Sequence, residues 1–159
     1  MAEAKTNVMR ILEKEKISYQ AHTYPHGKEA VDGETVAALL RQDVRTVFKT
    51  LVTIGKTGQH YVFVIPVAKE LDLKKAAKAA GEKSIEMIKS KELLPLTGYI
   101  HGGCSPIGMK KFFPTCIDRT AEDCDTICFS AGKIGYQVEM SLETLSKMIR
   151  FSLADLTEE

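Results

Sequence analysis

The spacing of apolar residues divides the chain into short helices and strands. In four segments apolar residues recur every three or four positions, which predicts amphipathic helices. These helices are expected from about Thr6 to Lys16, from Asp32-Gly33 onward, between Asp72 and Gly81, and after Ser141. Aspartate and serine favour helix starts and glycine favours helix ends, so these residues mark the boundaries. In the second helix Val36, Leu39 and Leu40 are expected to face the core, and a turn at 90–94 is expected to stop at Pro95.

Apolar runs with a period of two predict the strands. The strongest signal is a pair of runs, Val47–Ile54 and Tyr61–Ile65, which flank the hairpin turn Gly55-Lys56-Thr57-Gly58. Further strands are expected at 17–24, 115–118, 126–130 and 136–140. The irregular order of elements does not fit a doubly wound sheet. It predicts an α+β (mixed α/β) fold with a barrel-like sheet edged by helices.

Length and composition favour one domain, residues 1–159, because 44% hydrophobic residues suffice for one core. Lys and Arg number 22 against 21 Asp and Glu, so the net charge is +1 and no global field attracts nucleic acid. A bound polyanion would need a local basic patch, and Lys74, Lys75, Lys78, Lys110 and Lys111 are either that or ordinary solvated surface. The segment 1–6 lacks the apolar run of a signal peptide, and no stretch is apolar enough to cross a membrane. We therefore expect a soluble, cytoplasmic protein.

The four cysteines, Cys104, Cys116, Cys124 and Cys128, form no CxxC pair and have no histidine at metal-ligand spacing. They are expected to be reduced thiols, and the sequence predicts neither a metal site nor a cofactor.

The segment Gly98–Gly108 contains four glycines and a proline, so it continues neither a helix nor a central strand. Gly102 and Gly103 carry no Cβ, which lets a phosphate, carboxylate or ester carbonyl approach the backbone N–H groups. Pro106 would fix the far end of the turn. A glycine-rich connector without a ligand is the competing interpretation.

Lys49 lies within an apolar strand, on the face shared with Val47 and Leu51. An ammonium group there either reaches solvent along its stem or sits beside a ligand. Both interpretations remain open from position alone.

Other polar residues allow weaker hypotheses. Cys104 with His101 suggests a cysteine hydrolase, which would need a stabilised thiolate. Ser105 lacks the G-x-S-x-G context of a nucleophile elbow. Ser130 would bind a ligand or cap a turn, and Tyr24 would line a pocket or close the core.

Four separated motifs resemble the YbaK/EbsC family, the free-standing relatives of the editing domain of bacterial prolyl-tRNA synthetases. They are Val47–Leu51, Leu71–Lys75, Gly98-Tyr99 with Gly102–Gly108, and Ser130–Lys133. The resemblance runs in order from His22 to Asp155 and is greatest to the Cys-tRNA(Pro) deacylase branch. It implies a mixed α/β domain around a partly open, barrel-like sheet.

The resemblance also implies an activity, the removal of cysteine wrongly attached to tRNA(Pro), with prolyl-tRNA synthetase as a partner. In this branch the substrate's own thiol attacks its ester carbonyl and forms a thiolactone. Lys49 matches the family's essential lysine, and Gly102-x-x-x-Pro106 matches its signature loop. By the same resemblance the substrate is held by Tyr24, Thr50, Ser130 and the loop residues Gly102, Gly103, Ser105 and Pro106.

The chain departs from the family pattern at several positions. The loop from Pro25 to Gly33 is short, Asp32 replaces an aromatic residue, Gln137 replaces an acid of some relatives, and Cys104 replaces an aliphatic residue. The first two of these departures bear on substrate choice more than on reaction type, because they fall near the expected pocket wall. Two alternatives therefore stay open: an Ala-tRNA(Pro) deacylase of the same family, which would need an activated water, and a non-catalytic module that binds tRNA or a synthetase.

Overall fold

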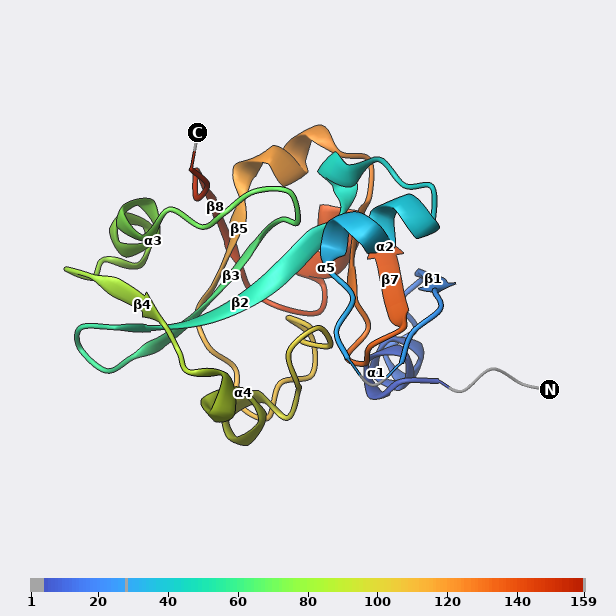
Figure 1. Ribbon diagram of the computed structural model, residues 1–159, viewed down its shortest axis with the longest axis horizontal. Helices are drawn as coiled ribbons and strands as arrows, with labels where there is room; N and C mark the ends of the chain where they lie inside the picture. The colour runs from blue at the N-terminus through green and yellow to red at the C-terminus, as the bar shows by residue number, and fades with distance from the viewer. Residues whose placement is uncertain (1–4, 28, 159) are drawn as a thin grey trace.

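Two open β-sheets carry the fold of the computed structural model, which describes residues 5–27 and 29–158 (Figure 1). One sheet has the strand order β4-β2-β3-β5-β8 and the other the order β1-β7-β6. The strands are β1 Gln20–Thr23, β2 Phe48–Gly55, β3 His60–Pro66, β4 Ile85–Met87, β5 Thr115–Asp118, β6 Ile127–Ser130, β7 Tyr136–Met140 and β8 Ser152–Ala154. The helices are α1 Asn7–Lys14, α2 Gly33–Leu39, α3 Leu73–Ala80, α4 Ser90–Thr97 and α5 Leu142–Ser146, with short 3₁₀ turns at Val44–Thr46 and Arg119–Asp123.

The predicted hairpin is confirmed and forms the centre of the larger sheet. β2 pairs antiparallel with β3, and Lys49 lies opposite Ile65. β3, β5 and β8 run parallel, so the sheet is mixed. A parallel bridge between Val47 and Cys128 joins β2 to the smaller sheet. The expected α+β fold is confirmed, and its sheets are open rather than closed into a barrel.

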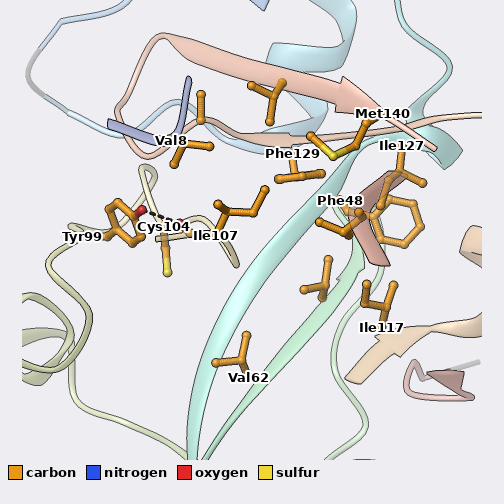
Figure 2. Packing of buried hydrophobic residues seen from close by; sticks show 14 of the residues in the cluster. Val8, Phe48, Val62, Tyr99, Cys104, Ile107, Ile117, Ile127, Phe129 and Met140 are labelled. Atoms are coloured by element: carbon orange, nitrogen blue, oxygen red, sulfur yellow. Dashed lines mark hydrogen bonds between the residues drawn. The ribbon is translucent and has the colours of Figure 1, made fainter. Parts of the chain in front are cut away.

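The main core lies between the two sheets (Figure 2). β2 and β3 contribute Phe48, Val52, Val62 and Val64, and the smaller sheet contributes Ile127, Phe129, Val138 and Met140. Tyr99, Cys104 and Ile107 of the glycine-rich segment pack into the same core, so this loop is anchored by hydrophobic burial. A second cluster, including Phe63, Ile65, Ala76 and Ala77, lies where α3 packs on the opposite face of the larger sheet.

The predicted helix boundaries agree with the observed caps. Thr6, Asp32, Asp72 and Ser141 each accept a hydrogen bond from a backbone N–H in the first turn that follows. Gly81 ends α3 in the left-handed conformation, with φ of 73°. The predicted burial of Leu39 is wrong, because its side chain is 50% exposed while Ala37 is buried in its place.

The stop expected at Pro95 is also wrong, because α4 continues through this residue to Thr97. Proline removes one N–H donor from the ladder, but the helix ends only two residues later. Gly98, with φ of 86°, then ends α4 and starts the glycine-rich segment.

Two short edge strands, β4 and β8, were not expected from the sequence. β8 and Leu156 fasten the carboxyl-terminal segment, since the Leu156 N–H donates to the buried Asp118 carboxylate over 2.9 Å. β1 is shorter than predicted and covers only Gln20–Thr23. Residues 1–4 of the amino-terminal segment considered above lie outside the described residues, as does Glu159. Within the described residues, no helix has the length and apolar character needed to cross a membrane.

Candidate functional site

A cavity of about 600 Å³ opens beside β2, at a gap in the sheet. β4 pairs with β2 only at Thr53–Gly55, and the bridge to β6 lies at Val47, so the edge of β2 between them has no strand partner. The cavity follows this open edge, and its volume lies within the usual range for small-molecule sites. One wall comes from residues 47–51, at the start of β2, and from the loop after β3. The rest comes from the segment that leads into α2, from α4, from the glycine-rich loop, and from one residue each of β6 and β7.

Lys49 lines this cavity. Among the described lining residues it is the only lysine, and there is no arginine. Its side chain is 31% exposed, and its Nζ lies 3.9 Å from the Glu70 carboxylate, which is itself 79% exposed. Of the two interpretations that the sequence leaves open for Lys49, both are compatible with this position: β2 reaches the cavity here, so the ammonium has access to solvent and to a ligand in the cavity. An exposed ion pair of this kind contributes about 0–1 kcal/mol, so an anionic ligand can displace Glu70 at small cost.

Thr50 offers polar groups to the same space. Its Oγ1 is buried and has no hydrogen-bond partner among the described residues, although the residue lines the cavity. The Ile88 N–H donates to the Val52 carbonyl on the outer side of β2, over 3.4 Å. Because backbone groups alternate along a strand, the Thr50 N–H and carbonyl also point to the open edge. A buried hydroxyl left unpaired is costly, and a bound substrate would satisfy it.

The glycine-rich loop forms the opposite wall through His101, Gly102 and Cys104. Gly102 has φ of 86°, and a Cβ on this residue would lie 2.5 Å from the Cβ of Ala30. Only glycine fits both the left-handed backbone and this contact. The hydroxyl of Tyr99 donates to the Ile107 carbonyl, which holds the two ends of the loop together (Figure 2).

Gly103, Ser105 and Pro106 lie behind this wall and are not part of the cavity lining. The Gly103 N–H is already bonded to the Ile100 carbonyl over 2.9 Å, so the predicted free amide is not available there. Ser105 is fully buried, and its Oγ accepts a hydrogen bond from the Ile107 N–H. These three residues therefore shape the loop, and Gly102 is the one of the four loop residues predicted to hold the substrate that lies in the cavity lining.

Tyr24 and Ser130 both lie in the lining, as the sequence predicts. The Ser130 Oγ also accepts from the Gly132 N–H over 3.1 Å, so this side chain caps the turn and keeps its own proton free to donate. The positions of departure, Asp32, Cys104 and Gln137, all line the cavity as well. The Gln137 Oε1 accepts from the Gln42 amide over 2.8 Å, which fixes the orientation of its side chain.

Several lining residues carry no signal in the sequence, among them Ala30, Glu70 and Leu93. They come from loops and a helix that only the tertiary fold brings to β2. Asp32 has two signals in the sequence, as the cap of α2 and as a departure from the family pattern.

The thiol of Cys104 is unsuited to nucleophilic attack. Burial raises the pKa of this thiol to about 12, so at pH 7 only about one molecule in 10⁵ would carry a thiolate. His101 lies in the lining as an exposed loop residue.

The site is thus a binding pocket in an α+β domain, with one ammonium group, exposed backbone of an open strand edge and a glycine-rich loop, and a thiol in its protonated form. This arrangement can hold an anionic or ester group and support developing negative charge. The chain belongs to the aminoacyl-tRNA editing domain family, which matches residues 28–148.

Known relatives agree with this assignment. A protein of Enterococcus faecalis named "Putative Cys-tRNA(Pro)/Cys-tRNA(Cys) deacylase EbsC" is 44% identical over 153 residues, which cover 96% of this chain and 93% of the relative. A solved structure described as a "putative trans-editing enzyme for prolyl tRNA synthetase" superposes with a TM-score of 0.83 at 21% identity and covers 99% of this chain and 100% of its own. Another, of the hypothetical protein APE2540, gives a TM-score of 0.84 at 22% identity and covers 95% and 99%. The two structures share the fold.

Proposed function

We propose that this protein is an aminoacyl-tRNA deacylase that removes cysteine wrongly attached to tRNA(Pro). The observation that carries the proposal is the cavity in which Lys49, the open edge at Thr50 and Gly102 meet. The name of the Enterococcus faecalis relative supports both the reaction class and cysteine as the amino acid. Because charged tRNA is consumed in translation, we place this activity in the cytoplasm.

The proposed reaction is substrate-assisted and needs no protein nucleophile. The cysteine sulfur attacks the carbonyl carbon of its own ester, the bond from that carbon to the 3′ oxygen breaks, and the thiol proton ends on the departing ribose oxygen. The products are free tRNA and a thiolactone, which water then opens to cysteine. In this scheme the protein holds the reacting groups in place and supports negative charge.

Each residue of the pocket has a role in this scheme. The Lys49 ammonium supports the departing 3′ oxygen or holds the phosphate of the terminal nucleotide. The Thr50 hydroxyl and the backbone N–H groups at Thr50 and Gly102 bind the ester and the ribose. Tyr24, Ser130 and Gln137 form the wall that surrounds the amino acid.

The central test measures amino-acid release from Cys-tRNA(Pro) and Ala-tRNA(Pro) by the wild type and by Lys49→Ala. We expect release of cysteine, and a loss of about 10²–10³-fold in Lys49→Ala, as for other groups that support an oxyanion. Lys56→Ala is the matched control, because this lysine lies in the β2–β3 turn outside the cavity lining. Undiminished release by Lys49→Ala, or no release of either amino acid by the wild type, would contradict the proposal.

The same assay distinguishes the alternatives. Faster release of alanine would assign the chain to the alanine-directed branch, and salt-sensitive tRNA binding without release would indicate a non-catalytic module. Ser-tRNA(Pro) tests the role of the substrate thiol, because serine has nearly the same shape but a much poorer nucleophile. We expect it to survive at least about 100-fold longer than Cys-tRNA(Pro).

We further propose that prolyl-tRNA synthetase supplies the specificity for tRNA(Pro). The net charge of this chain is only +1, so its own electrostatic hold on tRNA is expected to be weak. Release from Cys-tRNA(Pro) and Cys-tRNA(Cys) should therefore be similar with the protein alone. Adding the synthetase should favour Cys-tRNA(Pro), and equal discrimination with and without it would contradict this partnership.

A further inference from the structure

A second cluster of reactive side chains lies on the smaller sheet, next to the wall of the deacylation cavity. The Gln42 amide donates both to Gln137, which lines that cavity, and to Cys128 of the cluster. In the smaller sheet Cys128 lies opposite Glu139, and His22 lies opposite Gln137, two residues before Glu139. Side chains two apart on a strand share a face, so His22, Cys128 and Glu139 project from one side of three neighbouring strands. The other side of this sheet carries Phe129, Val138 and Met140 into the main core.

The three side chains bring together one nitrogen, one sulfur and one oxygen. His22 Nε2, Cys128 Sγ and a Glu139 carboxylate oxygen all lie within 4.8 Å of one another. The His22 Nε2 and Glu139 Oε1 atoms are 2.7 Å apart. Bond lengths of about 2.0–2.3 Å in a tetrahedral zinc site place ligand atoms about 3.3–3.6 Å apart. A tetrahedral site therefore requires the His22 and Glu139 atoms to move apart by less than about 1 Å, and any pair of ligand atoms near the 4.8 Å limit to move closer by about 1.2 Å.

Neighbouring groups already orient two of these ligands. The Thr126 hydroxyl donates to Glu139 Oε2, which leaves Oε1 directed toward His22. The Gln42 Nε2 group donates a hydrogen bond to Cys128 Sγ over 3.6 Å. Metal-ligating side chains are commonly oriented by hydrogen bonds of this kind from neighbouring residues. Gln42 Oε1 is buried without a partner among the described residues, and a metal-bound water would satisfy it.

A separate cavity of about 420 Å³ gives access to the cluster. Cys128 and Glu139 line it together with Asp43, Asp123 and Asp125, and no lysine or arginine is among its described lining residues. The Asp43 carboxylate is paired with Arg45 over 2.7 Å, so the negative potential comes mainly from Asp123, Asp125 and Glu139, and it favours the entry of a cation over that of an anion.

We propose that His22, Cys128 and Glu139 bind a zinc-class divalent cation, with a water molecule in the fourth position. Imidazole, thiolate and carboxylate together select a borderline-soft metal such as Zn²⁺ or Co²⁺ over Mg²⁺ or Ca²⁺. Binding releases the Cys128 thiol proton to solvent and moves the His22 proton from Nε2 to Nδ1. The hydrogen bond between His22 Nε2 and Glu139 is then replaced by two metal bonds. This site could not be predicted from the sequence. Its ligands come from three strands that are far apart in the chain, and their spacing matches no metal-binding motif.

The test is a titration of the metal-free full-length protein with Co²⁺, which reports a thiolate ligand by its sulfur-to-metal charge-transfer absorption. We expect one Co²⁺ per chain, with displacement by Zn²⁺ and none by a large excess of Mg²⁺. Cys128→Ser should abolish the absorption band and weaken Zn²⁺ binding at least about 100-fold, since even loss of a second partner costs 10–100-fold. Cys124→Ser is the matched control, because this thiol lines the same cavity but lies outside the cluster, and it should leave the band intact.

Two milder variants protect the test against misfolding of Cys128→Ser. His22→Ala alters a partly exposed side chain and should weaken Zn²⁺ binding at least about 100-fold. Thr126→Val removes only the orienting hydroxyl and should weaken it about tenfold. The proposal is overturned if the wild type shows no thiolate band, or if both His22→Ala and Cys128→Ser bind Zn²⁺ as tightly as the wild type. Neither the Co²⁺ absorption band nor the Zn²⁺ affinity depends on deacylation. The metal-site proposal and the deacylase proposal can therefore fail independently.

Discussion

At the scale of single residues, the environment of each side chain decides which chemistry is open to it. Cys104 and Lys49 line the same cavity, but burial holds one as a neutral thiol while access to solvent keeps the other available to a ligand. From the sequence, a nucleophilic Cys104 is one hypothesis, and Lys49 either reaches solvent or sits beside a ligand. The structure favours a site that binds and polarises rather than one that attacks.

This difference predicts that the Cys104 side chain is dispensable for deacylation. Cys104→Ala keeps the backbone N–H in the loop and removes only a protonated thiol, so the rate of amino-acid release should stay within about threefold of the wild type. The same single-turnover assay on Cys-tRNA(Pro) measures it. In the wild type, Cys104 should also react with iodoacetamide more slowly than the less buried Cys124. A loss of activity comparable to that of Lys49→Ala would instead support the cysteine-hydrolase hypothesis.

At the scale of elements, the glycine-rich loop is held in shape by contacts on both sides. Gly102 packs against Ala30, and Gly103 packs against the backbone at Lys133 and Ile134. Tyr99 and Ile107 anchor the loop in the core, so its position relative to β2 is fixed before any substrate binds. The loop therefore pre-organises the wall opposite Lys49.

A pair of glycine substitutions tests this role. Gly102→Ala and Gly58→Ala both place alanine at a positive φ, 86° and 91°, which costs about 1 kcal/mol of stability. Only at Gly102 would the new Cβ also meet a neighbour, at 2.5 Å, because Gly58 has open space around it. We expect Gly102→Ala to lose more stability in urea denaturation than Gly58→Ala because of this contact, and only Gly102→Ala to lose deacylation in the folded protein, by at least about tenfold. Equal activity of the two variants would show that the loop's shape is not needed.

The elements that could be read from the sequence are those with strong local signals. The β2–β3 hairpin and the capped starts at Thr6, Asp32, Asp72 and Ser141 depend on nearby residues and were predicted correctly. β4 and β8 have three residues each and form by pairing with a neighbouring strand. The local sequence pattern therefore does not predict them. Lys49, Thr50 and Gly102 lie in motifs that are visible in the sequence, so they could be proposed in advance. The positions of Glu70 and Ala30 depend on tertiary packing, so these two residues could not be proposed.

At the scale of the whole molecule, the main core links distant parts of the chain. It contains Val8 of α1, Phe48 of β2, Ile107 of the loop and Leu145 of α5. We therefore propose that residues 1–159 form one domain that unfolds cooperatively, because loss of any of these elements exposes the same core. Cys104 lies within this core, so its ionisation is coupled to unfolding of the whole chain.

This coupling predicts a loss of stability at alkaline pH. Burial raises the pKa of the Cys104 thiol from 9.0 to about 12, so between these values the unfolded chain loses a proton that the folded chain retains. The folded state then binds more protons than the unfolded state, and its free energy of unfolding falls by about 1.4 kcal/mol per pH unit for this group. Below pH 9 both states hold the proton, and the contribution is constant.

Replacing the thiol with an alkyl group of similar size should remove the contribution of Cys104 to this pH dependence, while that of Cys128, whose thiol pKa burial also raises to about 12, remains. Urea denaturation of Cys104→Val between pH 7 and pH 11 should show a decline about 2.7 kcal/mol smaller than in the wild type by the upper end of the range. Ile107→Val is the control: it shortens a buried side chain in the same loop without a titratable group, so its curve should run below the wild type at a constant offset of about 1 kcal/mol. Parallel curves for the wild type and Cys104→Val would mean that the thiol ionises equally well in both states, and the argument that it stays protonated in the cavity would be wrong.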